Sequence, residues 1–291
     1  MCGITLLYAP NGVNNVKPIF DLWTHQEKRG RDASGIFAIT NKGVLYAKAP
    51  VPASEFVPIV RDYVQRHGLV LYYALMHARS ATRGTPLSNK NNHPIVRRTD
   101  SAIYAIVHNG TVDGVSACAE KLTATDTEEL LCAYMSGGVE KLKDVLKYKN
   151  TTLGIIAVGK DGNLIDFVVA RVGNKPLVRA EFGDAVVYAS EVPKELSDKF
   201  SVVKPSISSL VKQYSDSILS YNYYLCHSCK KEVALKFNLE NVAEYKGARI
   251  LRDYYYYSTL YASTLGGAYY KCYGPDEACM EFAREFECVC T

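Results

Sequence analysis

The sequence contains no apolar run near 18 residues, so it offers no candidate for a helix that spans a membrane. The first eight residues lack the basic segment and the long apolar segment of a secretory signal peptide, and a cytoplasmic location is therefore expected. Runs of lysine or arginine are also missing, and 34 basic against 30 acidic residues leave a net charge of only +4. This charge is too small to argue for a nucleic-acid or membrane partner, and neither is expected.

At 291 residues the chain can form one large domain or two modest ones with a sizeable core. Short apolar runs predict many strands and few helices. Helices are expected at Val16–Lys28, Glu55–Arg66 and Asp126–Met135. Strands are expected at residues 3–8, 35–40, 43–48, 69–77, 103–108, 152–158, 164–170, 176–181 and 185–190. This order of elements predicts an α+β fold whose second half is mainly sheet.

Cys2 directly follows Met1, so removal of the initiator methionine would leave the cysteine with a free α-amino group. An α-amine has an unperturbed pKa of about 7.7–8.0 and a cysteine thiol one of about 8.5. Near neutral pH the amine can take the thiol proton, directly or through one water, so a single residue supplies nucleophile and base. The alternative interpretation is a structural cysteine near a chain end.

Further polar motifs follow Cys2-Gly3-Ile4 in order along the chain. They are Arg29-Gly30-Arg31-Asp32, His77-Ala78-Arg79-Ser80-Ala81-Thr82, Asn91-Asn92-His93-Pro94, His108-Asn109-Gly110, Thr125-Asp126-Thr127-Glu128 and Tyr188-Ala189-Ser190-Glu191. Over about residues 2–195 this series resembles the class II glutamine amidotransferase (N-terminal nucleophile, or Ntn, hydrolase) domain, as in glucosamine-6-phosphate synthase, amidophosphoribosyltransferase and asparagine synthetase. The resemblance implies a four-layer α/β/β/α sandwich of two antiparallel sheets.

The resemblance also implies an activity, the release of ammonia from L-glutamine through a thioester on Cys2. Asn109 and Gly110 match the pair that stabilises the oxyanion in this family. Arg79 offers a planar fork for the glutamine carboxylate, and Asp126 offers a negative charge for its ammonium group. The remaining implied residues are Thr82 and His93, which would bind substrate, and Arg29 and Asp32, which would support the nucleophile.

Several of these residues also have plain structural interpretations. Asn-Gly is the commonest hairpin turn, so Asn109-Gly110 could simply connect two strands. Asp126 could cap the helix that follows it. A single histidine is more often structural than functional, which leaves two roles open for His93. We expect structural roles for His25, His67 and His77.

Two features depart from the family pattern. Many members have an aromatic residue after the arginine of the His-x-Arg motif and a histidine after its threonine, whereas this chain has Ser80 and Arg83. The segment between Asn109 and Asp126 is also shorter than in the sugar-phosphate synthases. Neither departure removes a catalytic atom, so they bear on the subfamily and on the loop that closes the site.

The apolar pattern weakens between Pro193 and Ser209, so we expect the amidotransferase domain at residues 2–200 and an extension at residues 206–291. Six of the nine cysteines fall in this extension. Cys226 and Cys229 form a Cys-x-x-Cys pair, which suits one half of a tetrahedral zinc site. Disulfides and unpaired thiols are the alternatives. Glutamine hydrolysis itself is expected to need no cofactor.

The expected extension is too short for the sugar isomerase, phosphoribosyltransferase or ATP pyrophosphatase domain that uses the ammonia in this class. We therefore expect L-glutamine as the substrate and a separate synthase subunit, or a second copy of the chain, as the partner. One alternative is a catalytically silent module that binds glutamine or serves as a scaffold. Another is an Ntn acylase acting on a different amide, although Arg79 with Asp126 favours glutamine.

Overall fold

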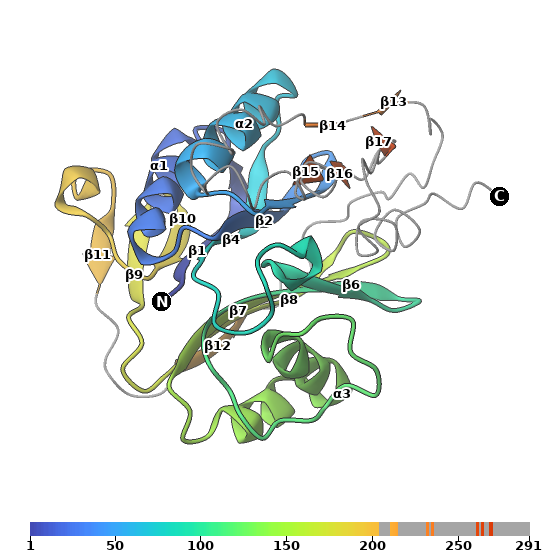
Figure 1. Cartoon of the computed structure of the whole chain (residues 1–291). Helices are drawn as coiled ribbons and strands as arrows, with labels where there is room; N and C mark the ends of the chain where they lie inside the picture. Colours follow the sequence, from blue (N-terminus) through green and yellow to red (C-terminus); the bar gives the residue numbers. More distant parts are fainter. Residues whose placement is uncertain are drawn as a thin grey trace, which may run out of the picture.

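The structure, a computed structural model, describes residues 1–203 and, further along the chain, the backbone of the short strands β12 to β17. Two sheets lie one above the other at its centre (Figure 1). The first sheet has the spatial order β11 (Ser201–Val203), β9 (Val178–Phe182), β10 (Ala185–Ala189), β1 (Gly3–Val13), β4 (Leu71–Arg79), β2 (Ala33–Thr40), β3 (Gly43–Ala49) and β16 (Ser263–Thr264). The second has the order β12 (Leu210–Tyr214), β8 (Leu164–Val172), β7 (Thr151–Gly159), β6 (Ala102–Gly110) and β5 (Ile95–Arg98).

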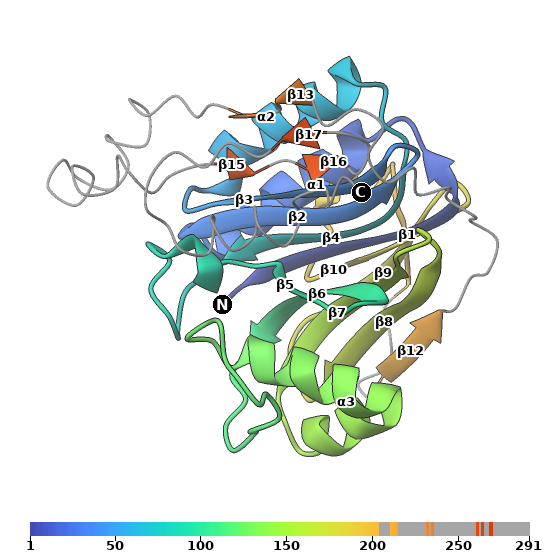
Figure 2. The ribbon, with the colours of Figure 1, turned by 90° about the vertical axis from the view of Figure 1, so that its right-hand side faces the viewer.

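Helices cover the outer faces of both sheets. Figure 2 shows α1 (Lys17–His25) and α2 (Ala53–Arg66) against the first sheet, and α3 (Thr127–Leu146) against the second. Short 3₁₀ turns complete the described helical structure at Gln26–Arg29, Asn89–Asn91 and Lys194–Leu196. Two small strand pairs lie further along the chain, β13 (Lys231–Glu232) with β17 (Ala268–Tyr269) and β14 (Ala234–Leu235) with β15 (Leu260–Tyr261).

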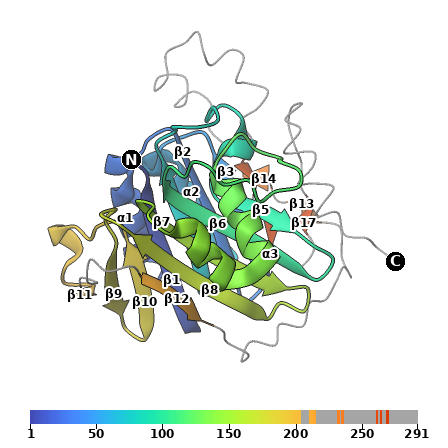
Figure 3. The same cartoon turned by 90° about the horizontal axis from the view of Figure 1, so that it is seen from below.

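Alternation along the strands produces three apolar layers. Side chains such as Leu6, Leu75 and Ile156 fill the space between the two sheets. A second cluster packs the first sheet against α1 and α2, and a third packs the second sheet against α3. Figure 3 shows α3 lying against the second sheet, seen from below. The fold is thus the four-layer sandwich of two antiparallel sheets that the sequence led us to expect, and that expectation is confirmed.

The expected elements differ from the observed ones mainly at their ends. The first helix stops at His25 and continues as a 3₁₀ turn to Arg29. The third helix was expected to end at Met135, but α3 runs to Leu146 across a break at Gly137 and Gly138, where the backbone is not helical. Strand β5 was not expected, because it is only four residues long and half of it is charged.

Strand β12 falls within the range expected for the extension, yet its backbone pairs with β8 at the edge of the second sheet. The expected zinc ligands Cys226 and Cys229 lie outside the described residues. Within the described part of the chain, no helix is both long and apolar enough to span a membrane.

Candidate active site

Cys2 lies immediately before β1, at the end of the first sheet. Because Gly3 pairs with Ala78, the antiparallel register brings Cys2 beside the end of β4. The Ser80 N–H group donates to Cys2 Sγ at 3.3 Å, and the thiol lies 3.4 Å from the Ser80 carbonyl oxygen. Burial raises the pKa of the Cys2 thiol, while the bond from Ser80 acts in the opposite direction. The thiol is therefore protonated at neutral pH and needs a base.

The residue after Cys2 has to be a glycine for reasons of space. A Cβ atom at Gly3 would lie 2.5 Å from Gln26 Cβ and 2.6 Å from the Gln26 carbonyl oxygen. Ile4 is held at the same point, because its N–H group donates to Ser190 Oγ at 3.0 Å and its carbonyl accepts from Ser190 N at 3.0 Å. These contacts fix the direction in which β1 presents Cys2.

Arg29 and Asp32 hold the backbone around Cys2. Arg29 Nε donates to the Cys2 carbonyl at 3.2 Å, and the guanidinium lies 3.6 Å from Glu191. Asp32 accepts from the Ala81 N–H group at 2.8 Å, next to the residue that contacts the thiol. Both side chains thus contact the backbone beside Cys2, and their role in supporting a nucleophile stays a prediction.

Asn109 reaches the backbone of Cys2 from the second sheet. Along β6, Ala105 and Val107 face the first sheet, so the alternation of a strand turns Asn109 the same way. Its Oδ1 accepts from the backbone nitrogen of Cys2 at 3.2 Å, and its side chain is 1% exposed. The Asn109 Nδ2 group is buried and has no hydrogen-bond partner. An unpaired donor next to Cys2 is the kind of group that could stabilise an oxyanion, and this role of Asn109 stays a prediction.

Asn109 and Gly110 are the last residues of β6 and pair with Thr152 and Thr151 on β7, so they do not form a hairpin turn. A Cβ atom at Gly110 would lie 2.7 Å from Thr151 Oγ1, which leaves room for glycine alone. The spacing of the two sheets thus places the amide side chain of Asn109 beside Cys2, with Gly110 next to it in the chain.

Arg79 ends β4 and is 3% exposed. Its guanidinium donates to Asn92 Oδ1 at 2.8 Å and to the carbonyls of Arg83 and Gly84 at 2.5 and 2.9 Å. Burial lowers its pKa, and the negative charges of nearby groups, among them Asp126, oppose that effect. Three of the five N–H groups of the guanidinium bind groups of the protein in this way, and its role in binding a substrate carboxylate stays a prediction.

Asp126 occupies the N-cap position of α3, but its carboxylate does not cap the helix. Instead, Asp126 Oδ2 accepts from the Val112 N–H group at 2.6 Å, and the side chain is 8% exposed. The Asp126 charge is also one of those that act on Arg79. The expected binding of the two ends of an amino-acid zwitterion by Arg79 and Asp126 stays a prediction.

The two other expected substrate-binding residues are placed differently. Thr82 is exposed on the segment after β4. His93 is 5% exposed, and its Nδ1 lies 3.2 Å from His77 Nε2. Burial lowers the pKa of His77 to about 3 and that of His93 well below its usual value, so both are neutral. This placement favours a supporting role for His93, and the substrate-binding roles of both residues stay predictions.

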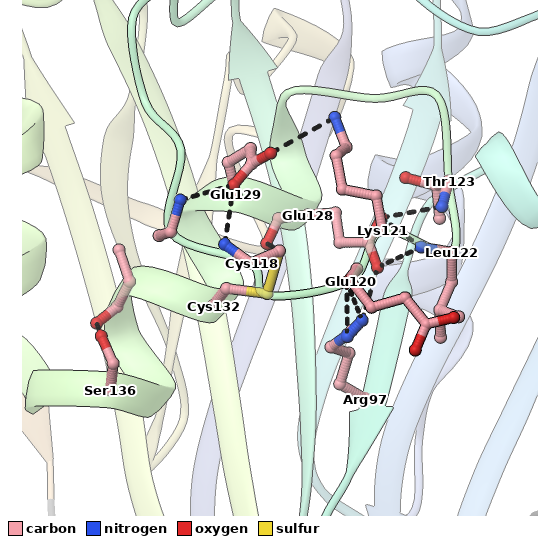
Figure 4. Close-up of a disulfide and its surroundings, with 12 residues drawn as sticks. Arg97, Cys118, Glu120, Lys121, Leu122, Thr123, Glu128, Glu129, Cys132 and Ser136 are labelled. Carbon is pink, nitrogen blue, oxygen red and sulfur yellow. Dashed lines mark hydrogen bonds and ion pairs between the residues drawn. A yellow bond between two sulfur atoms is a disulfide. The ribbon is translucent and has the colours of Figure 1, made fainter.

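The loop between Gly110 and Asp126 is fastened to the first turns of α3 (Figure 4). A disulfide joins Cys118 of the loop to Cys132 of the helix. The buried carboxylate of Glu128 accepts from two backbone N–H groups of the loop, and that of Glu129 accepts from two others. These ties hold the short segment that connects Asn109 to Asp126.

The sequence patterns missed three features of the site. Ser80 acts through its backbone, so its side-chain type carries no signal. Asn92 accepts a hydrogen bond from Arg79. The sequence placed it in a motif but predicted no role for it. The pairing of Cys118 with Cys132 joins residues from a loop and a helix, and the sequence offered no basis for choosing it. Among the described residues, no group of three or more His, Cys, Asp or Glu side chains could hold a metal ion.

The family model for class II glutamine amidotransferases matches residues 6–157 of the chain. The glutamine–fructose-6-phosphate aminotransferase of Fusobacterium nucleatum is 26% identical over 173 residues, which cover 55% of this chain and 27% of that protein. The enzyme of the same name from Halobacterium salinarum is 28% identical over 213 residues, which cover 66% of this chain and 31% of that protein. The chain thus spans less than a third of the length of these relatives.

Two solved structures have a similar fold. Glutamine phosphoribosylpyrophosphate amidotransferase from B. subtilis, complexed with ADP and GMP, gives a TM-score of 0.51 at 19% identity, over 75% of this chain and 50% of that one. A structure of the allosteric regulatory enzyme of purine biosynthesis gives a TM-score of 0.54 at 19% identity, over 76% of this chain and 50% of that one. At this identity the likeness concerns the fold.

Proposed function

Because this chain belongs to the class II glutamine amidotransferases, we propose that it hydrolyses L-glutamine to glutamate and ammonia through a thioester on Cys2. The contact between the Cys2 nitrogen and Asn109 Oδ1, with the unpaired Asn109 Nδ2 beside it, is the observation that carries the proposal. This contact supports an arrangement in which the Cys2 thiol as nucleophile, the Cys2 nitrogen as base and Asn109 Nδ2 as oxyanion donor lie close together.

The proposed reaction uses only groups of this chain, glutamine and water. After removal of Met1, the Cys2 nitrogen is an α-amine that takes the thiol proton, and the sulfur then bonds to the side-chain amide carbon of glutamine. Asn109 Nδ2 and the Gly110 N–H group stabilise the oxyanion. The carbon–nitrogen bond breaks, the amine returns its proton to the leaving nitrogen, and ammonia departs. Water, deprotonated by the same amine, hydrolyses the thioester and releases glutamate.

The use of the ammonia is a further proposal. The relatives named above are aminotransferases and amidotransferases at least twice as long as the matched region. We propose that this domain delivers ammonia to a synthase on another subunit or to a second copy of the chain. Hydrolysis at Cys2 would need no cofactor. A cytoplasmic location stays a prediction, and the Cys118–Cys132 disulfide is of a kind that is rare in the cytosol.

The test is an assay of the purified chain with its N-terminus defined by intact mass. Protein that begins at Cys2 should release glutamate and ammonia from L-glutamine, and protein that retains Met1 should not, because a peptide nitrogen cannot act as the base. A panel of other amides, including acylated amines without an amino-acid end, should react far more slowly. Faster turnover of such an amide would favour the acylase alternative, and no turnover of any amide by chain beginning at Cys2 would favour a silent binding module.

Arg79→Lys and Asp126→Asn are each expected to raise the Michaelis constant for glutamine about ten- to a hundredfold. Each loses one charge-dependent contact to the zwitterion, worth about 1.5–3 kcal/mol. Asparagine at position 126 keeps an oxygen that can accept from Val112, so the fold should persist. Steady-state kinetics and thermal unfolding are the measurements.

The matched control for these variants is Asp62→Asn, which removes an exposed carboxylate that pairs with Arg66 on α2. It should leave both the Michaelis constant and the unfolding temperature near their original values. If Asp126→Asn instead lowers the unfolding temperature and leaves the Michaelis constant unchanged, Asp126 has a purely structural role at the start of α3.

A further inference from the structure

His108 lies next to Asn109 on β6 but faces the opposite side of the sheet. Its ring is 2% exposed and is bound at both nitrogens. Nδ1 lies 3.0 Å from the Thr127 hydroxyl, in the first turn of α3, and Nε2 lies 2.6 Å from the Thr151 hydroxyl on β7. The Thr151 hydroxyl in turn donates to the Asn109 carbonyl oxygen at 3.4 Å.

One assignment of the protons satisfies all three contacts in this chain of hydrogen bonds. A threonine hydroxyl has one proton, and that of Thr151 goes to the Asn109 carbonyl, so its oxygen accepts from His108 Nε2–H. In a neutral imidazole, Nδ1 is then the acceptor and takes the proton of the Thr127 hydroxyl. Burial lowers the pKa of His108 to about 4, against the opposing effect of the Asp126 charge, which agrees with a neutral ring.

The two ends of this series of hydrogen bonds lie next to two parts of the proposed site, the ammonium-binding residue and the oxyanion donors. Thr127 directly follows Asp126, the proposed partner of the substrate ammonium group. Thr151 contacts the carbonyl of the Asn109–Gly110 peptide, whose N–H group belongs to the proposed oxyanion donors. Because a trans peptide is planar, its carbonyl and its N–H group point in opposite directions, so a contact that fixes one also fixes the other.

We propose that His108 is a positioning residue that, through the hydroxyls of Thr127 and Thr151, ties the orientation of the oxyanion peptide to the start of α3. The role rests on the proposed function, because it acts on the oxyanion donors of that reaction. His108 itself does not touch the substrate. Its effect passes through one hydroxyl on each side, so it should alter the chemical step more than glutamine binding.

The test uses Thr151→Val, which keeps the shape of the side chain and removes the hydroxyl. This variant should lower kcat about tenfold and leave the Michaelis constant within twofold, since the donors are turned away but remain present. Thr151→Ser restores the hydroxyl and should return most of kcat. His108→Gln should show the same loss as Thr151→Val, and the double variant should lose no more than either single variant, because both break one chain of contacts.

Two controls separate this role from general stability. Thr5→Val removes a buried hydroxyl that has no hydrogen-bond partner, and His67→Gln changes an exposed histidine at the end of α2, so both should keep kcat within twofold. A nitrogen NMR spectrum of the original chain should show the proton of His108 on Nε2.

The outcomes distinguish failure of the positioning role from failure of the proposed function. If the original chain hydrolyses glutamine but Thr151→Val keeps full kcat, or its loss falls in the Michaelis constant, the positioning role is wrong and the proposed function stands. If Thr151→Ser is as slow as Thr151→Val, the hydroxyl is not the cause and the role is again overturned. An original chain that begins at Cys2 and hydrolyses no glutamine overturns both.

Discussion

Replacing Cys2 by alanine is expected to abolish glutamine hydrolysis, with a loss of at least about a thousandfold, while the protein stays folded. The thiol is the proposed nucleophile, and its described contacts are made with the backbone of one residue, Ser80. The stability lost with these weak sulfur contacts should therefore be about 1 kcal/mol or less. Glutamate release and thermal unfolding are the measurements.

The control is covalent labelling with a diazoketone analogue of glutamine, followed by mass spectrometry of the peptides. The label should be found on Cys2 and be absent from the Cys2→Ala protein. Cys2→Ser offers a matched comparison, since a hydroxyl keeps the geometry and is the poorer nucleophile. Labelling of another cysteine with Cys2 unmodified, or full activity of Cys2→Ala, would remove Cys2 from the mechanism.

The pH dependence follows from the same residue. Because burial raises the thiol pKa, the thiolate is scarce at neutral pH and the α-amine has to take the proton. The amine does so only when it is itself unprotonated. The value of kcat/KM should therefore be low in acid and rise with pH through the pKa of the amine, near about 7.7–8.0 if that pKa is unperturbed.

Replacing Asn109 by alanine is expected to lower kcat about a hundred- to a thousandfold, which corresponds to about 2.7–4 kcal/mol of barrier. The Asn109 Nδ2 group is buried and unpaired in the free protein, so it is ready to receive the negative oxygen. It gains a partner mainly when that charge develops, so the Michaelis constant should change little. Steady-state kinetics of the two proteins provides the measurement.

Asn109→Asp is the informative companion to this variant. Aspartate keeps an oxygen for the Cys2 nitrogen but loses the Nδ2 donor and adds a negative charge, so it should be at least as slow as alanine. If both variants kept their kcat and lost only thermal stability, Asn109 would be a structural residue at the end of β6.

Much of the fold could be predicted from the sequence, because its signals are local. The alternation of apolar residues identified the central strands of both sheets, with most bounds within a few residues of the observed ones, but it missed short edge strands such as β5. The part that failed is also local. The backbone is not helical at Gly137 and Gly138, and the expected helix ended just before them. The observed helix continues beyond this break because Leu142 and Leu146 pack against the second sheet.

The sequence by itself determined which chemical groups are available: a cysteine after Met1, an Asn-Gly pair, an arginine and an aspartate, in the order of one family. Their meeting was decided by the tertiary structure, because Cys2 contacts residues 78 and 107 positions away, and only the registers of two sheets set such distances. The tertiary structure also decided that Asp126 does not cap its helix and that His108 faces α3. Those outcomes depend on which neighbours a side chain meets after packing, and a local pattern does not contain that information.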